Sequence, residues 1–184
     1  MNTTKIAIID FEATCDNSEK VIPRGEMEII EIGCVIADLK GNTYNHFSTF
    51  VKPILHPNLT PFCKELTHIS QEDVDSGLHL LEAFKNMNLF LRDEKIKTWT
   101  SWGDWDKTQV HRNIKHYKKM KRPFEFMKFH YFDLSEKYYK HQGLPQTCGL
   151  IKALARHEIE FTGTPHRGLD DVINTAKLLP FSGL

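Results

Sequence analysis

Apolar residues along the chain form short continuous runs and, elsewhere, stripes with helical spacing. The runs predict β-strands, because roughly four to eight successive apolar residues bounded by turn residues are typical of strands buried in a sheet. These strands are expected over Lys5–Glu12, Glu28–Asp38, Tyr44–Val51, Lys97–Trp102 and Phe129–Leu134. Between the second and third strands, the sequence Lys-Gly-Asn at positions 40–42 is typical of an antiparallel hairpin turn.

The stripes predict α-helices. They are expected over Gln71–Leu91, Lys107–Arg122, Leu150–His157 and Leu169–Leu179. In the first helix, Leu81, Phe84, Asn88 and Leu91 fall on one stripe. Ser70 is placed to cap this helix, and Pro123 closes the second one. Strands followed by strands alternating with helices indicate an α/β fold, a mixed five-stranded sheet flanked by helices.

The composition is that of an ordinary globular domain. A chain of 184 residues suits one compact domain with a sizeable core, so we expect a single domain over residues 1–184. Lysine plus arginine and aspartate plus glutamate each number 24, so the formal net charge is zero. A nucleic-acid footprint would therefore have to be local.

The N-terminus and the cysteines predict a cytoplasmic protein. The opening residues lead directly into the first strand without a signal-peptide pattern, and no apolar run is long enough to cross a bilayer. Cys15, Cys34, Cys63 and Cys148 are scattered without paired spacing. This spacing disfavours disulfides and a zinc knuckle.

A pair of carboxylates, Asp10 and Glu12, ends the first strand. Residues two apart on a strand point to the same face, so both carboxylates emerge together. Like charges held close in a partly buried position repel each other and lose hydration, and a hard divalent cation such as Mg²⁺ removes both penalties. The alternative is a strand end that simply reaches solvent. An Asp-x-Glu pair is common in sequences, so the pair alone does not decide between the two.

A second acidic segment, Trp102-Gly103-Asp104-Trp105-Asp106, follows the fourth strand. Loop residues at strand ends commonly carry chemistry, and here two carboxylates lie between indoles. The alternative is that one of them caps the basic helix that follows. For one of the two, capping is the better interpretation.

The third segment, His166-Arg167-Gly168-Leu169-Asp170-Asp171, begins the last helix. A carboxylate in the first turns of a helix can bind a metal while a histidine of the preceding loop reaches over the same site. The alternative is N-terminal capping by one of the two aspartates, beside a surface histidine.

Taken together and in this order, the segments resemble the DEDD exonucleases, in the subgroup whose final motif carries histidine. The resemblance is closer still to the Eri-type RNA exonucleases and to bacterial members similar to an inhibitor of the sporulation kinase pathway. It rests on DFEATC at 10–15, EIIEIG at 28–33, PFCKELTHI at 61–69, GDWD at 103–106 and HRGLDDVIN at 166–174. It covers nearly the whole chain and implies a ribonuclease H-like fold.

The resemblance implies two Mg²⁺ ions, for which Mn²⁺ can substitute, held by Asp10, Glu12, Asp106 and Asp171. His166 is then the general base that takes a proton from the attacking water.

Position within the motifs decides between neighbouring acids. Asp106, directly after Trp105, matches the family position better than Asp104. Asp171 has the family spacing from His166, and Asp170 has not.

The implied reaction is the release of nucleoside 5′-monophosphates from a free 3′ end, with single-stranded RNA favoured over DNA. Glu12 would contact the terminal 3′ hydroxyl, and the backbone of Ala13 would contact the same nucleotide. Phe62, Leu66 and Trp105 are candidates for stacking against terminal bases, as His166 is for contacting the substrate. Core packing is the alternative for the three apolar side chains, and for Leu66 the favoured one.

A basic run follows the second acidic segment. It contains Lys107, Arg112, Lys115, Lys118, Lys119, Lys121 and Arg122, with no acid among them. Because it starts beside the proposed site, it could follow a phosphate backbone. A solvated helix face is an equal alternative.

Two other functions compete with the RNA exonuclease. A non-catalytic regulatory protein of a signalling pathway could use the same fold, but a pure binder does not need four clustered carboxylates. A proofreading exonuclease acting on DNA belongs to the same superfamily, and the motif at 61–69 favours the RNA-directed branch by resemblance. We expect a monomer with no membrane partner.

Overall fold

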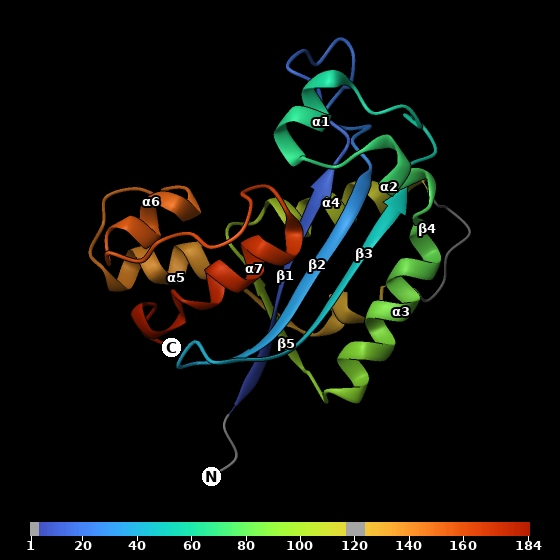
Figure 1. The fold of residues 1–184 in the computed structure, drawn as a ribbon. Coiled ribbons are helices and arrows are strands. Elements are labelled where there is room, and N and C mark those ends of the chain that lie inside the picture. The colour runs from blue at the N-terminus through green and yellow to red at the C-terminus, as the bar shows by residue number, and fades with distance from the viewer. Residues whose placement is uncertain (1–3, 117–123) are drawn as a thin grey trace.

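A mixed six-stranded β-sheet forms the centre of the protein (Figure 1). The computed structural model describes residues 4–116 and 124–184. The strands are β1 (Lys5–Ala13), β2 (Ile29–Asp38), β3 (Thr43–Lys52), β4 (Leu78–His79), β5 (Thr98–Ser101) and β6 (His130–Asp133), in the spatial order β4-β3-β2-β1-β5-β6. β1 pairs antiparallel with β2, as β2 does with β3, whereas the β3–β4, β1–β5 and β5–β6 pairs are parallel. The predicted α/β class and mixed sheet are confirmed.

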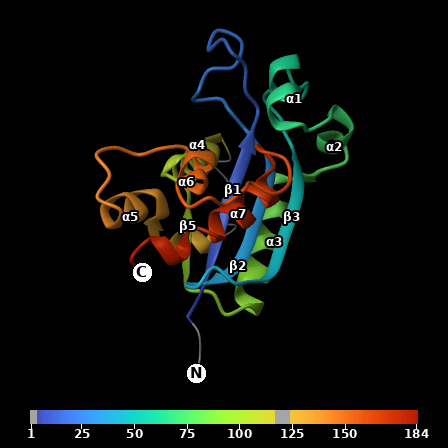
Figure 2. The same ribbon diagram turned by 60° about the vertical axis from the view of Figure 1, so that its left-hand side comes forward.

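Helices lie on both faces of this sheet. They are α1 (Pro61–Thr67), α2 (Gln71–Asp75), α3 (Leu80–Asp93), α4 (Trp105–His116), α5 (Leu134–His141), α6 (Leu150–Ala155) and α7 (Gly168–Ala176), with 3₁₀ turns at Glu125–Lys128 and Leu179–Phe181. Figures 1 and 2 show α7 across one face, over β1 and β2, and α3 on the other face.

The residues of β1 alternate between these two faces. Ile9 and Phe11 pack in the core with α3, whereas Ile8 packs with α7. By the same alternation, Asp10 and Glu12 point toward α7. The strand thus packs apolar side chains against helices on both faces of the sheet, whereas its two carboxylates lie on the α7 face only.

The single helix predicted over Gln71–Leu91 is wrong, because the segment contains two helices separated by β4. The break comes at Gly77, where a Cβ atom would lie 2.9 Å from the carbonyl carbon of Phe50. Without a side chain, the backbone approaches β3 closely enough for Leu78 to pair with Val51. The sheet therefore has a sixth strand beyond the predicted five.

The break also shifts the buried face of the helix. The predicted cap at Ser70 is confirmed, since its hydroxyl accepts a hydrogen bond from Asp73 N at 3.1 Å at the start of α2. Because α3 begins only at Leu80, Leu81 lies 41% exposed while Phe84 is buried.

Two short helices, α1 and α5, are absent from the predicted elements although their starts carry clear signals. Thr60 caps α1 by accepting a hydrogen bond from Cys63 N at 3.0 Å, and Pro61 occupies the first position. Asp133 caps α5 by accepting a hydrogen bond from Glu136 N at 3.2 Å. With 7 and 8 residues, these helices are too short for a persuasive apolar stripe.

The predicted basic helix corresponds to α4, which begins two residues earlier, at Trp105. Lys107, Arg112 and Lys115 lie on it. Lys118, Lys119, Lys121 and Arg122 lie outside the described residues. In the part of the chain that the structure describes, no helix is long and apolar enough to span a membrane.

Candidate active site

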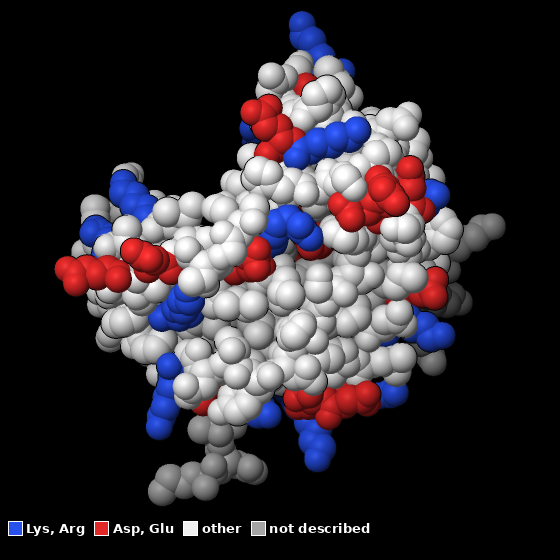
Figure 3. Space-filling view, in the orientation of Figure 1, with Lys and Arg blue, Asp and Glu red and all other residues white. Residues whose placement is uncertain are grey.

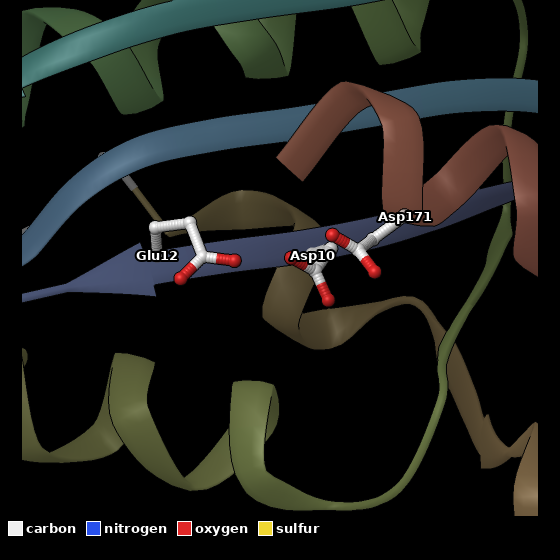
Figure 4. A group of neighbouring side chains, drawn as sticks. All are labelled: Asp10, Glu12 and Asp171. Atoms are coloured by element: carbon white, nitrogen blue, oxygen red, sulfur yellow. The ribbon is translucent and has the colours of Figure 1, made fainter. Parts of the chain in front are cut away.

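Three carboxylates converge where the end of β1 meets the start of α7. Asp10 and Glu12 extend from β1 and Asp171 from the first turn of α7 (Figure 4). One oxygen of each residue lies within 4.8 Å of the corresponding oxygens of the other two. Oxygen ligands gathered in this way are what hard divalent cations bind.

Close backbone packing places α7 against β1 and β2. A Cβ atom at Gly33 of β2 would overlap the backbone of Gly168, and one at Gly168 would lie 3.4 Å from the carbonyl oxygen of Asp10. Two residues without side chains therefore allow the start of α7 to rest directly on the sheet. This contact brings Asp171 beside Asp10.

Glu31 secures the loop that leads into α7. Its buried carboxylate accepts hydrogen bonds from Arg167 Nε at 3.2 Å, Arg167 Nη2 at 3.1 Å and Gly168 N at 3.0 Å. It lies directly opposite Glu12 in the register of β1 and β2. Glu31 is not among the predicted site residues, although an acid within the apolar run 29–37 signals a buried partner.

Asp106 joins the site from the first turn of α4. Its side chain is buried, and Oδ1 accepts a hydrogen bond from Phe11 N at 2.9 Å. This N–H is available because β5 pairs with β1 at Ala7 and Ile8 and ends before reaching Phe11. Asp104 is exposed. These positions support the choice of Asp106 as the ligand.

Asp170 and Asp171 are adjacent in sequence but serve different places. Asp170 Oδ2 accepts a hydrogen bond from Thr164 N at 2.8 Å, so this carboxylate holds the preceding loop. Asp171 faces Asp10 and Glu12 instead. This division supports Asp171 as the ligand.

Asp106 is buried and the other three carboxylates are half-buried, and this loss of hydration raises the pKa of each. Burial, with repulsion from Asp106 and Glu12, raises the pKa of Asp10 well above its usual range. Burial, with repulsion from Asp171, raises the pKa of Glu12 to about 9. Burial also raises the pKa values of Asp106 and Asp171 to about 7, although hydrogen bonds from backbone N–H groups limit the rise.

One oxygen of the cluster lacks a partner. Within residues 4–116 and 124–184, Asp171 Oδ2 is buried and accepts no hydrogen bond. A buried acceptor without a donor is costly, and so are several carboxylates held together in a dry site. A divalent cation removes both costs, so the residues present fit a metal centre.

A cavity of about 260 Å³ opens onto the carboxylates. It is lined by Asp10, Phe11, Glu12, Ala13, Cys15, Met27, Leu66, Trp102, Trp105, Asp106 and His166. The predicted site residues all line it except Asp171, which adjoins it through the acidic cluster, and Phe62, which lies half-buried on α1.

His166 reaches this cavity from the loop before α7 with a left-handed backbone, at a φ of 61°. Residues with side chains adopt this conformation uncommonly, and it costs roughly 1–2 kcal/mol. Backbone strain of this kind is often found at functional sites.

Four further cavity residues, Phe11, Cys15, Met27 and Trp102, were not predicted as site residues. Cys15 and Trp102 are each part of a motif quoted above, so their neighbourhood was a signal. Met27 carries no local signal in the sequence, because it is brought to the cavity by the long loop between β1 and β2.

This fold, with four carboxylates and a histidine around one cavity, is that of a nuclease of the ribonuclease H-like class. The profile of the RNase_T exonuclease family matches residues 7–179. The chain belongs to this exonuclease family.

The relatives agree with the predicted Eri-type resemblance. Probable 3′-5′ exonuclease KapD of Bacillus subtilis (strain 168) is 33% identical over 97% of this chain and 84% of its own length. ERI1 exoribonuclease 2 of Xenopus laevis is 32% identical over 94% of this chain, and ERI1 exoribonuclease 3 of Mus musculus 33% over 94%. The chain spans 27% and 51% of these two longer relatives.

A solved structure has the same fold. The nuclease domain of 3′hExo, described as a DEDDh family member bound to rAMP, superposes with a TM-score of 0.85 at 26% identity. The match covers 96% of this chain and 90% of that domain. The ribonuclease H-like fold and the DEDDh resemblance are confirmed.

Without metal, the free energy of unfolding is expected to fall as pH rises from about 5 to about 9. The unfolded carboxylates titrate near pH 4, whereas the folded cluster titrates at about 7 and about 9, so the folded state binds more protons across this window. Mg²⁺ should restore stability most at the alkaline end. The midpoint of thermal unfolding, measured at about pH 5 and about pH 9 in EDTA and in Mg²⁺, tests this expectation. An unfolding midpoint that rises with pH in EDTA and does not change when Mg²⁺ is added would contradict it.

Asp106→Ala is expected to lose activity, whereas Asp104→Ala should keep it. Asp106 is buried against β1 beside the cluster, whereas Asp104 is exposed. Single-turnover rates of the two folded variants at saturating metal decide the point. An inactive Asp104 variant beside an active Asp106 variant would reverse the assignment.

Proposed function

We propose that the protein is a metal-dependent 3′→5′ exonuclease that releases nucleoside 5′-monophosphates from single-stranded 3′ ends, with RNA preferred over DNA. The observation that carries this proposal is the convergence of four carboxylates of raised pKa, Asp106 buried and the other three half-buried, beside a cavity that His166 also lines. A regulatory binder has no need of such a costly cluster, so that alternative is not favoured.

In this proposal Asp10, Glu12, Asp106 and Asp171 would hold two Mg²⁺ ions, which Mn²⁺ can replace. When bound, such ions supply positive charge to the reacting phosphate and make water a stronger nucleophile. The hydrogen bond from Phe11 N already fixes the position of Asp106.

The remaining cavity residues would position the substrate and move a proton. His166 takes a proton from the attacking water, at the cavity wall where its backbone holds it. Glu12 and the backbone of Ala13 receive the terminal nucleotide. Leu66 and Trp105 offer apolar surfaces to its base, since Trp105 is 38% exposed. Phe62 would act from outside the cavity lining.

The preference for RNA rests on the relatives named as exoribonucleases. We further propose one exonuclease domain over residues 1–184, a monomer, and a cytoplasmic location. All four cysteines are free, which fits a reducing compartment.

The test uses single-stranded RNA and DNA of one sequence, labelled at the 5′ end. With Mg²⁺ or Mn²⁺ we expect a ladder that shortens one nucleotide at a time, faster on RNA, with nucleoside 5′-monophosphate as product. EDTA or a 3′-phosphate on the substrate should stop it. Internal cleavage, or no cleavage with either metal, would overturn the proposal.

A further inference from the structure

A second cavity, of about 320 Å³, adjoins the candidate active site. Its lining consists of Cys15, Asp16, Asn17, Glu19, Ile22, Arg24, Met27, Trp105 and Arg112. Cys15, Met27 and Trp105 line both cavities. The two cavities therefore lie side by side and share these three lining residues, between α4 and the loop that follows β1.

Helix α4 connects the two cavities. Trp105 and Arg112 are seven residues apart, which is close to two helical turns, so they lie on the same side of α4 about 10 Å apart along its axis. Trp105 begins the helix beside Asp106. Arg112 therefore marks the position that a polymer reaches when it extends from the acidic cluster along this helix.

The Arg112 side chain is held in place by a buried residue. Gln109 is fully buried, donates a hydrogen bond to the backbone carbonyl of Met27, and accepts one from Arg112 Nη1 at 3.5 Å. Asn113 donates to the same Met27 carbonyl at 2.8 Å. The helix thus fixes the loop through Met27, and the weak 3.5 Å contact with Gln109 orients the guanidinium beside it.

The charges in the second cavity leave Arg112 as its available cation. Arg24 pairs with Glu19 at 2.6 Å, and both side chains are largely exposed. The carboxylate of Asp16 accepts a hydrogen bond from Ser18 N at 2.9 Å within its own loop. Among the described residues, no carboxylate lies within 4.0 Å of the Arg112 guanidinium.

On the face drawn in Figure 3, basic and acidic residues are interspersed, and no continuous basic area covers it. A nucleic acid would therefore depend on local contacts, as the zero net charge predicts. The second cavity combines one such contact with apolar walls from Ile22, Met27 and Trp105.

We propose that the second cavity binds the nucleotide that precedes the 3′-terminal one, with Arg112 contacting a backbone phosphate. A guanidinium binds a phosphate oxygen pair well, and the apolar walls suit a base or sugar of any sequence. This inference rests on the proposed exonuclease function. It adds a subsite that selects for chain length.

The experiment compares two substrates, a mononucleotide (thymidine 5′-monophosphate p-nitrophenyl ester) and single-stranded oligonucleotides. In the mononucleotide the nitrophenyl group takes the place of the preceding nucleotide as the leaving group, and there is no second phosphate for Arg112 to contact. Arg112→Gln should lower the ratio of oligonucleotide to mononucleotide kcat/KM about tenfold, the size of one charge-assisted hydrogen bond. The slope of log KM against log salt should fall by about 0.7 for one lost phosphate contact on a single strand.

Arg156→Gln is the matched control, because Arg156 is an exposed arginine at the end of α6 outside both cavities. For the Arg156 variant, the ratio of oligonucleotide to mononucleotide kcat/KM and the salt dependence of KM should equal those of the parent. Arg112→Met, which keeps the aliphatic stem, gives the same test if Arg112→Gln folds poorly.

The outcomes separate the two proposals. If the parent protein hydrolyses neither substrate, the exonuclease function itself fails. If the parent hydrolyses both, and a folded Arg112 variant keeps the parent ratio and salt slope, the subsite is wrong while the function stands.

Discussion

Asp10→Asn and Asp171→Asn are expected to abolish metal-dependent hydrolysis while making the metal-free protein more stable at alkaline pH. Neutral amides are poor replacements for carboxylates at a hard cation. Metal ions contribute several kcal/mol to such reactions, so the rate should fall on the order of 10³-fold.

The gain in stability has the same cause as the loss of activity. Burial and repulsion raise the pKa of both aspartates, so ionising the cluster above neutral pH weakens the fold. An asparagine removes one of those charges. In EDTA at about pH 9, each variant should unfold at a higher temperature than the parent. Added Mg²⁺ should stabilise the variant less than the parent.

Asp170→Asn is the control for this pair. An asparagine oxygen can still accept the hydrogen bond from Thr164 N, so the loop and the activity should be retained. Parental rates in a folded Asp10 or Asp171 variant at saturating metal would remove that residue from the site.

His166→Asn is expected to slow turnover by about 10²–10⁴-fold, the usual cost of a missing general base. Asparagine is chosen because it tolerates the left-handed backbone at this position better than alanine. Substrate KM and metal affinity should change little, because the carboxylates hold the ions. The exposed His46, replaced by asparagine, is the control and should match the parent.

The pH dependence identifies the role of the histidine. A general base acts only in its unprotonated form, so the parent should lose activity on the acid side, and this limb should be lost or displaced in the variant. The carboxylates also bind metal less well as pH falls, so both proteins are compared at saturating Mg²⁺. Equal turnover and an identical acid limb would show that His166 is not the base, and Glu12 would be the next candidate.

The sequence could predict which side chains lie together where they belong to one local motif. Asp10 and Glu12 follow from the two-residue repeat of a strand, whose alternation also places Ile8 on the same face. The choice of Asp106 and Asp171 over their neighbours came from family spacing, and burial and hydrogen bonding agree with it.

The sequence failed where a contact between distant segments decides the structure. The break at Gly77 depends on the backbone of Phe50, which no window around residue 77 contains. The partnership of Glu31 with Arg167 joins segments that only the fold brings together. Met27 reaches the cavity in the same way, because Gln109 holds its carbonyl.

The gap between Asp10 and Asp171 depends on the contact between Gly33 and Gly168 as well as on the hydrogen bonds of Glu31, and this contact is main chain against main chain. Rotamer changes cannot widen or narrow it, because neither residue has a rotamer. Gly33 and Gly168 should therefore tolerate few substitutions, although neither has a functional group. A survey of variants scored by activity would rank these glycines beside the acids, although neither takes part in any chemical step.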